Sequence, residues 1–97
     1  MEENHDLGPL TPIQARDTVR RILEHGTTSF SSHAREEMAN DDLQVGDCLN
    51  VLRGGAFEPP ELINGTWRYR VSTNRICVVV VIPRDDRVRV VTVWRKK

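Results

Sequence analysis

The fold is decided by the run Ile76–Ile82, which reads ICVVVVI. Every residue in this run is apolar, and Pro83 follows it directly. A strand with water on one face alternates apolar and polar residues, so a run with no polar position is typical of a central strand covered on both faces. A buried helix can show the same pattern, but the run is short and β-branched and ends at proline, which favours a strand over Arg75–Ile82.

Two further strand-like runs flank the central one: Thr66–Ser72 before it and Arg87–Trp94 after it. Turn-forming residues separate the three runs, with Asn64-Gly65 before the first, Thr73-Asn74 after it and Arg84-Asp85-Asp86 before the last. Turn residues between β-branched runs are the local signature of hairpins. The last third of the chain therefore predicts an antiparallel meander.

Both outer strands alternate in polarity. Because successive side chains of a strand point to opposite faces, the first strand places Trp67, Tyr69 and Val71 against Arg68, Arg70 and Ser72. The last strand places Val88, Val90, Thr92 and Trp94 against Arg89, Val91, Val93 and Arg95. We therefore expect one apolar face, with both tryptophans in the core, and one face that carries several arginines and the function.

The first half of the chain predicts helices. Thr11 and Pro12 are a strong helix start and Gly26 is a stop, which predicts a helix over Pro12–His25. Ser31-Ser32 caps a second helix from Ser32 to about Ala39. A third helix is expected over roughly Asp42–Arg53, before Gly54-Gly55.

Three segments are expected outside these helices. Residues 1–10 form a tail, Thr27–Phe30 is a brief extended segment, and Ala56–Ile63 is a loop or an edge strand interrupted by Pro59-Pro60. The order predicts an α+β fold, with N-terminal helices packed on one face of a C-terminal antiparallel sheet in a single domain over residues 11–97.

The net charge of zero hides a strong asymmetry along the chain. Residues 1–66 contain five basic and twelve acidic residues, a net charge of −7, whereas residues 67–97 contain nine basic and two acidic residues, a net charge of +7. A basic sheet suits nucleic acid or an acidic protein, although a solvated strand face can also carry arginines.

Several function classes are disfavoured by the composition. Cys48 and Cys77 lack the spacing of metal ligands, and both are expected to be reduced packing residues. No stretch is long enough to cross a membrane, and the acidic start does not resemble a signal peptide. We expect a cytoplasmic protein without membrane contact.

Four stretches together resemble the DUF4258 family, which is placed among RelE/barnase-like ribonuclease toxins. They are Phe30–Met38 (FSSHAREEM), Asp47–Gly55 (DCLNVLRGG), Trp67–Val71 (WRYRV) and Val91–Arg95 (VTVWR). The chain also resembles the motility quorum-sensing regulator (MqsR) branch of these toxins. The single motifs are weak, and their order is the stronger signal.

The resemblance implies a RelE-like fold and a metal-independent mRNA endoribonuclease without cofactors, the toxin of a type II toxin–antitoxin system. Its partners would be mRNA, including mRNA on the ribosome, and an antitoxin with a zinc-finger or helix-turn-helix domain. By the same resemblance, Arg95 is the basic residue that closes the last strand, and Arg68 is the polar residue after the strand tryptophan. A central-strand tyrosine of the MqsR branch has no match here, because Ile76 and Cys77 stand at that place, so Tyr69 could replace it only from a neighbouring strand.

RNA cleavage without metal needs a proton acceptor for the 2′-hydroxyl, cations for the phosphate and a proton donor for the leaving 5′-oxygen. Arg68, Arg70 and Arg95 are expected to clamp the phosphate, because the guanidinium fork forms two hydrogen bonds to it. His33 is the proton-transfer candidate, with a structural role at the helix start as the equal alternative. Further RNA contacts are expected from Arg89, Lys96 and Lys97.

Two other functions remain open from the sequence. The same fold could be a catalytically inactive module that binds RNA or an acidic partner protein, with salt-sensitive binding and no cleavage products. It could also be a purely protein-binding domain, which would bind RNA no better than any weakly basic surface.

Overall fold

The computed structural model describes residues 8–97 and confirms the α+β fold class. The helices are α1 (Pro12–His25), α2 (Ser32–Asn40) and α3 (Val45–Gly54). The strands are β1 (Thr27–Phe30), β2 (Ala56–Phe57), β3 (Glu61–Ile63), β4 (Thr66–Ser72), β5 (Ile76–Arg84) and β6 (Arg87–Arg95).

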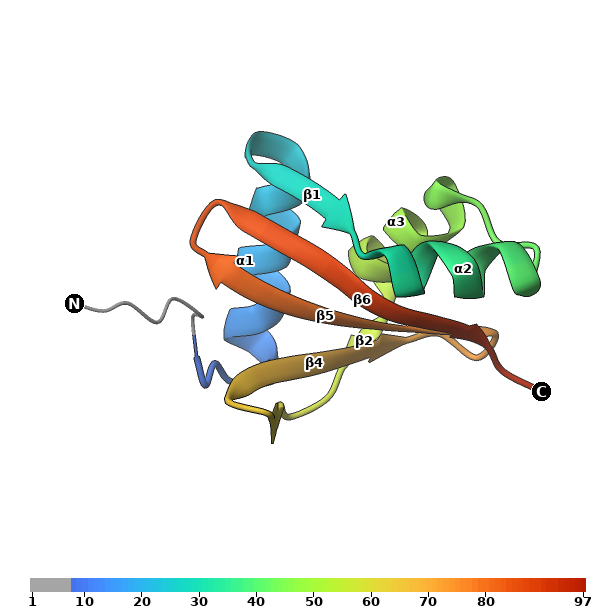
Figure 1. Ribbon diagram of the computed structural model, residues 1–97. Coiled ribbons are helices and arrows are strands. Elements are labelled where there is room, and N and C mark those ends of the chain that lie inside the picture. Colours follow the sequence, from blue (N-terminus) through green and yellow to red (C-terminus); the bar gives the residue numbers. More distant parts are fainter. Residues whose placement is uncertain (1–7) are drawn as a thin grey trace.

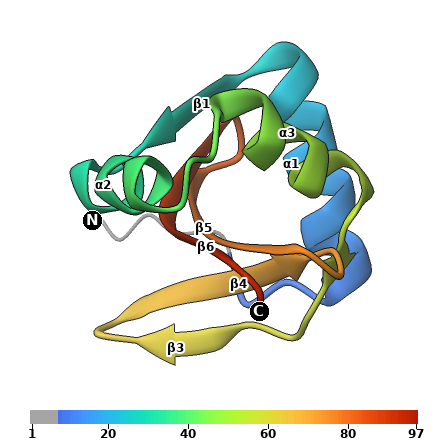
Figure 2. The same cartoon turned by 90° about the vertical axis from the view of Figure 1, so that its right-hand side faces the viewer.

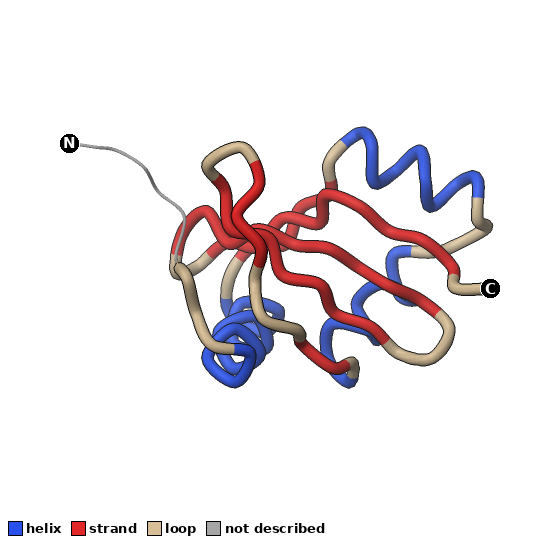
Figure 3. Tube along the Cα trace, turned by 90° about the horizontal axis from the view of Figure 1, so that it is seen from below, coloured by secondary structure: helices blue, strands red, loops and turns tan. Residues whose placement is uncertain are grey.

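The strands form one sheet in the order β1-β6-β5-β4-β2, and β3 pairs with the other half of the same edge of β4. The predicted meander β4-β5-β6 is antiparallel, whereas β1 runs parallel to β6. Figures 1 and 3 show α1 and α3 on one side of the sheet and α2 beside the C-terminal half of β6. In Figure 2 the sheet is strongly curved, with β3 below β4.

The helix ends agree with the capping residues in the sequence. At the start of α1, the Thr11 hydroxyl accepts a hydrogen bond from the Gln14 N–H, and the Gln14 side chain accepts one from the Thr11 N–H. This reciprocal pair satisfies two amide groups that the helix itself leaves free. The predicted start of α3 at Asp42 was wrong, because Asp42 has a positive φ of 56°, and the helix begins only at Val45.

The core lies between α1, α3 and one face of the sheet. It contains Val19 and Ile22 from α1, Cys48 and Leu52 from α3, and a patch of β-branched residues from β5 and β6. As predicted, β5 is central, and most of its residues are buried, although α1 and α3 cover only one of its faces (Figure 1). The strand does not end at Pro83 as expected, but continues to Arg84 with an irregular register after Val81.

A β-bulge in β6 overturns the predicted faces of that strand. Val79 pairs with Thr92, but the next residue, Val80, pairs with Val90, so Val91 is an extra residue. The alternation is therefore reversed after the bulge: Val93 is fully buried in the core, and Trp94 lies on the face opposite the helices. The expectation that Trp94 belongs to the core was wrong, whereas partly buried Trp67 does pack against the core.

Helix α2 closes the edge of β6 where β1 ends. The Ser31 N–H donates to the Val90 carbonyl, and the carboxylates of Glu37 and Asp41 accept hydrogen bonds from the backbone N–H groups of Val93 and Arg95 at 3.1 and 2.9 Å. One helical turn separates the two carboxylates, and two strand positions separate the two N–H groups, so the spacings match. These contacts satisfy N–H groups that would otherwise be exposed at a sheet edge.

The segment Ala56–Ile63 forms the interrupted edge strand that was one of its two predicted alternatives, with Pro59-Pro60 between β2 and β3. Leu10, at the end of the predicted tail, packs against the core and donates its N–H to the Tyr69 hydroxyl at 2.9 Å; residues 1–7 lie outside the described part of the chain. Within residues 8–97, no helix combines the length and the apolar character needed to cross a membrane.

Candidate functional site

The sheet face opposite the helices contains a cleft of about 210 Å³, which we call the arginine cleft. Its floor and walls come from three adjacent strands and from the β2–β3 segment. The lining residues are Arg68 and Arg70 of β4, Val79 of β5, Thr92 and Trp94 of β6, and Glu58, Pro59, Glu61 and Ile63. The cleft therefore combines cations, carboxylates and an aromatic ring on a face that α1 and α3 leave uncovered.

The two arginines of the cleft are available to an anion. No ion pair joins Arg68 or Arg70 to a carboxylate within the described residues, although Glu58 and Glu61 line the same cleft. The Arg68 Nε is buried and has no hydrogen-bond partner among residues 8–97. Buried donors in folded proteins nearly always have a partner, so the arrangement favours an acceptor that enters from outside.

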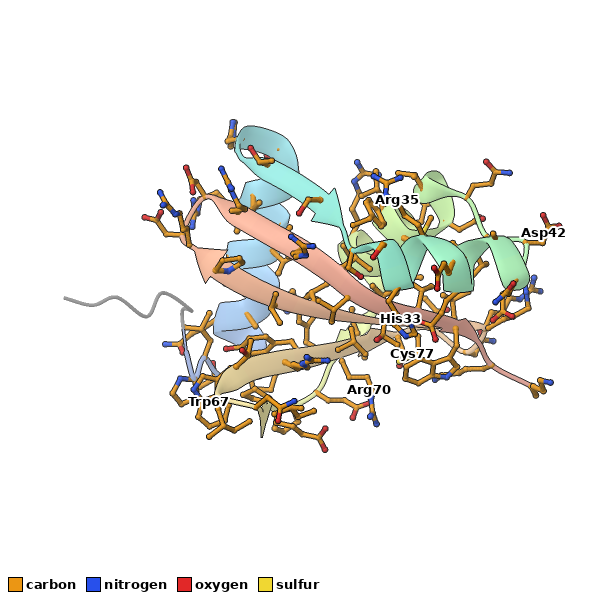
Figure 4. The ribbon with its side chains drawn as sticks, viewed as in Figure 1. His33, Arg35, Asp42, Trp67, Arg70 and Cys77 are labelled. Carbon is orange, nitrogen blue, oxygen red and sulfur yellow. The ribbon has the colours of Figure 1, made fainter. Side chains whose placement is uncertain are left out.

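Trp94 positions the second arginine. The Arg70 guanidinium carbon lies 5.7 Å from the centre of the Trp94 ring, within the range of a cation–π interaction. In Figure 4, Arg70 extends from β4 away from the helices. Trp94 reaches this face only because the bulge at Val91 reverses the alternation of β6.

A tight hairpin turn places one of the two glutamates. Asn64 and Gly65 both have positive φ angles, 52° and 80°, as a type I′ turn requires. This two-residue turn pairs Ile63 with Thr66 and therefore sets Glu61 directly opposite Arg68. Glu58 is held beside Arg70, because its N–H donates to the Arg70 carbonyl at 3.0 Å.

Cys77 is buried next to the cleft, on the row of the sheet that pairs Ser72, Cys77 and Trp94. Burial raises the pKa of its thiol above the ordinary value, although the positive charges of Arg70 and Lys96 act in the opposite direction. The neutral thiol is therefore favoured, and Cys77 is a packing residue under the open face, as the sequence predicted.

The structure does not bring Arg95 to the two β4 arginines. Its backbone N–H donates to the Asp41 carboxylate, and its Nε and Nη2 donate to the Asp41 carbonyl at 3.3 and 3.0 Å. A cation at the carbonyl end of a helix is a favourable cap. The expected convergence of Arg95 with Arg68 and Arg70 was wrong because the bulge turns Arg95 toward α2.

Neither predicted proton-transfer residue lines the arginine cleft. His33 is exposed on α2, with its Nε2 3.4 Å from Glu37 Oε2, and Tyr69 is fully buried on the helix-covered face. The Tyr69 hydroxyl accepts a hydrogen bond from the Leu10 N–H, which agrees with core packing as its main role. Figure 4 shows His33 on α2, at the edge of the sheet.

The other predicted RNA contacts surround the cleft without lining it. Arg89 is exposed and pairs with Val81, on the same sheet face as Thr92. Lys96 and Lys97 follow β6 and are exposed, and the Lys96 N–H donates to the Arg75 carbonyl. These cations extend the positive charge of the open face.

Sequence reasoning missed Glu58, Glu61 and the role of Trp94. The signal for Glu61 was present, because counting back from the Asn64-Gly65 turn pairs it with Arg68. No comparable signal existed for Trp94, since the residues Val90, Val91, Thr92 and Val93 are β-branched throughout and do not mark the bulge. Glu58 depends on the path of the chain around Pro59-Pro60, which local sequence does not fix.

Residues 8–97 contain no group of three or more His, Cys, Asp and Glu side chains that could hold a metal ion. The model of the family described as Domain of unknown function (DUF4258) matches residues 30–95, more than half of the chain. The chain therefore belongs to the DUF4258 family. No curated protein and no solved structure gives a significant match.

Proposed function

We propose that this member of the DUF4258 family is a metal-independent endoribonuclease that cleaves RNA in the arginine cleft. The observation that carries the proposal is a pair of arginines, not ion-paired within the described residues, that share an open cleft with two glutamates. Arg68 and Arg70 would hold the phosphate, and Glu58 or Glu61 would act on the 2′-hydroxyl. This set differs from the one expected from the sequence, because the two glutamates replace His33 and Tyr69, and Arg95 is no longer part of the phosphate site.

The reaction that this set supports is an intramolecular displacement. A glutamate takes the proton of the 2′-hydroxyl, the 2′-oxygen bonds to phosphorus, and the bond from phosphorus to the 5′-oxygen breaks. The leaving oxygen takes a proton from water, which reaches the open cleft, and the protonated glutamate gives its proton to the resulting hydroxide, so that water and the carboxylate are restored. The products are a 2′,3′-cyclic phosphate and a free 5′-hydroxyl, so no other reactant is consumed.

The two arginines would act where negative charge develops. As the 2′-oxygen attacks, charge builds up on the non-bridging phosphate oxygens, and fixed guanidinium groups stabilise it without rearrangement. Removal of one such donor typically lowers the rate by about 10²–10³-fold. The free Arg68 Nε is ready to donate to one of these oxygens, because no described residue accepts its hydrogen bond.

The resemblance to RelE- and MqsR-type toxins gives this activity a biological role. We infer that the enzyme degrades mRNA as a toxin and that a cognate antitoxin blocks the arginine cleft. Induced expression in a bacterium should then arrest growth with loss of intact mRNA, and Arg70→Gln should relieve both effects. Normal growth in the presence of soluble, folded protein would contradict the toxin role.

The direct test uses purified full-length protein and single-stranded RNA in the presence of a chelator. Cleavage should yield cyclic phosphate ends, and a matched all-deoxy strand should remain intact because it has no 2′-hydroxyl. We expect Arg70→Gln to lower the rate by about 10²-fold or more, and a Glu58→Gln/Glu61→Gln variant to lower it at least as far.

Arg84→Gln is the matched control for the cleavage test, because Arg84 is an exposed arginine of the same sheet that does not line the cleft. Its activity should equal that of the wild type. If the folded wild type binds RNA without cleaving it, the inactive RNA-binding module is the correct reading. Equal cleavage by wild type and Arg70→Gln would refute the assigned site.

A further inference from the structure

We propose that the open face binds single-stranded RNA along a defined path, with one base stacked on Trp94, the phosphate of that nucleotide held by Arg70 and Arg68, and the next phosphate held by Arg89. The path rests on the proposed function, because it uses the same cleft, and it adds the substrate class and two binding residues. The position of Trp94 on this face did not follow from the sequence.

Three rows of side chains cross the open face, as the strand register shows. The first row is Ser72, Cys77 and Trp94, the second is Arg70, Val79 and Thr92, and the third is Val81 with Arg89 across from it on β6. Arg68 comes just before Tyr69, where the pairing of β4 with β5 begins, and it lines the arginine cleft together with Arg70. Along β5, successive rows are two residues, or about 6.5–7 Å, apart. On β6 the bulge adds one residue between Thr92 and Arg89. The spacing along β5 is comparable with that of successive phosphates in an extended single strand.

Trp94 provides the stacking surface of the first row. Its indole is on the open face, partly exposed, and contacts the Arg70 guanidinium, which lies beside it in the second row. Aromatic side chains next to arginines are the recurring arrangement by which proteins bind unpaired bases, because every base has a flat face and every nucleotide a phosphate. A base on Trp94 would place its own phosphate near Arg70 and Arg68, the two arginines of the cleft.

The third row offers a second phosphate position. Arg89 pairs with Val81, and no ion pair is found for Arg89 in the described part of the chain. Val81 itself is buried at 7% exposure, so the row has a covered apolar residue beside the exposed Arg89. This arrangement fits a phosphate better than a base.

The cleft favours one strand over two. Its volume of about 210 Å³ is below the range of about 300–1,000 Å³ that encloses a complete small ligand, so it holds part of one nucleotide of a longer chain. The bases of a duplex are stacked on one another and cannot present a free face to Trp94. A duplex should therefore contact the arginines only from outside.

The test measures binding separately from cleavage, with full-length protein and a 2′-O-methyl oligonucleotide that cannot react. In a Trp67→Phe background, Trp94 is the only tryptophan, so its fluorescence reports on the cleft. Single-stranded oligonucleotide should quench this emission at saturation, whereas a duplex of the same sequence and inorganic polyphosphate should not.

Affinities of a labelled strand for variants locate the path. We expect Trp94→Leu to weaken binding about 5- to 100-fold and Trp94→Phe to restore most of it. Arg89→Gln should weaken binding and reduce the salt dependence by about one phosphate contact, and Arg84→Gln should do neither.

The outcomes separate this inference from the proposed function. Cleavage of RNA without quenching of Trp94 would remove the path and leave the enzyme in place. Quenching without cleavage would keep the path and remove the enzyme. Binding that Trp94→Leu leaves within twofold of the wild type, equal quenching by duplex, or no binding of the oligonucleotide would each overturn the inference.

Discussion

The contacts between α2 and β6 predict that Glu37 stabilises the half of β6 that carries Trp94. The Glu37 carboxylate accepts the Val93 N–H at 3.1 Å, and its side chain is only 29% exposed. A hydrogen bond to a charged group contributes about 1.5–3 kcal/mol, and partial access of water places this one near the lower end. Glu37→Ala should therefore lower the free energy of unfolding by about 1.5 kcal/mol.

That loss corresponds to a decrease in melting temperature of about 6–12 °C for a domain of this size. A more local measurement is amide hydrogen exchange, in which the Val93 N–H should exchange about tenfold faster in the variant. The amide of Val78, across the sheet on β5, should exchange faster only to the extent that the loss of global stability explains.

Two control variants isolate the contact. Glu37→Gln keeps an oxygen acceptor and should recover about half of the loss, because a neutral hydrogen bond is roughly half as strong as a charged one. Glu36→Ala removes the same type of side chain from the next position of α2, where it is exposed and forms none of these contacts. If Glu37→Ala and Glu36→Ala give the same melting temperature and the same Val93 exchange, the proposed closure of the β6 edge is refuted.

Two shorter predictions concern buried groups. Burial, with a smaller contribution from the negative charge of Asp47, raises the pKa of the Cys48 thiol from 9.0 to about 11. At pH 8 the folded protein should therefore carry about 100-fold less thiolate at Cys48 than an exposed thiol would, and Cys48 should be alkylated correspondingly slowly. Alkylation followed by mass spectrometry measures this rate, and fast labelling of the folded protein would contradict the prediction. Gly26→Ala would press a methyl group onto the Asp86 carbonyl and should cost about 1–3 kcal/mol in a denaturation experiment, whereas Gly46→Ala, which meets no atom within 4 Å, should be neutral or stabilising.

Strong local signals predicted most of the fold. The caps at Thr11 and Ser31 and the stop at Gly26 gave the bounds of α1 and the start of α2, and the apolar run of β5 predicted a central strand. These features depend on residues close in sequence, which is why they can be read without a structure. The parallel pairing of β1 with β6 depends on contacts between distant segments and was not predicted.

The candidate site was less predictable because one inserted residue decides it. With regular alternation, Trp94 would lie in the core and Arg95 on the arginine face. The bulge at Val91 exchanges these two positions, so the strand that was expected to contribute a cation contributes an aromatic ring instead. Arg68 and Arg70 do lie on the sheet face predicted for them, since β4 has no bulge in its pairing with β5.

The bulge also links the contacts of α2 with β6 to the arginine cleft. After Val91 the backbone N–H groups of Val93 and Arg95 point to the open edge of β6, where Glu37 and Asp41 accept them. The side chain of Arg95 is used to cap α2 in the same contact, and the side chain between these two residues, Trp94, is directed to the arginine cleft. Thus the hydrogen bonds from β6 to α2 fix the register of β6 that places Trp94 in the arginine cleft.

Arg68 has a buried donor with no acceptor among the described residues, and this is the strongest physical reason to expect a ligand in the arginine cleft. Exposed arginines such as Arg84 lose nothing by lacking a protein partner, because water hydrates them. The Nε of Arg68 is buried, so folding removes its water without supplying an acceptor from the described residues. A phosphate oxygen in the arginine cleft would satisfy this donor, and the neighbouring Arg70 would share the charge.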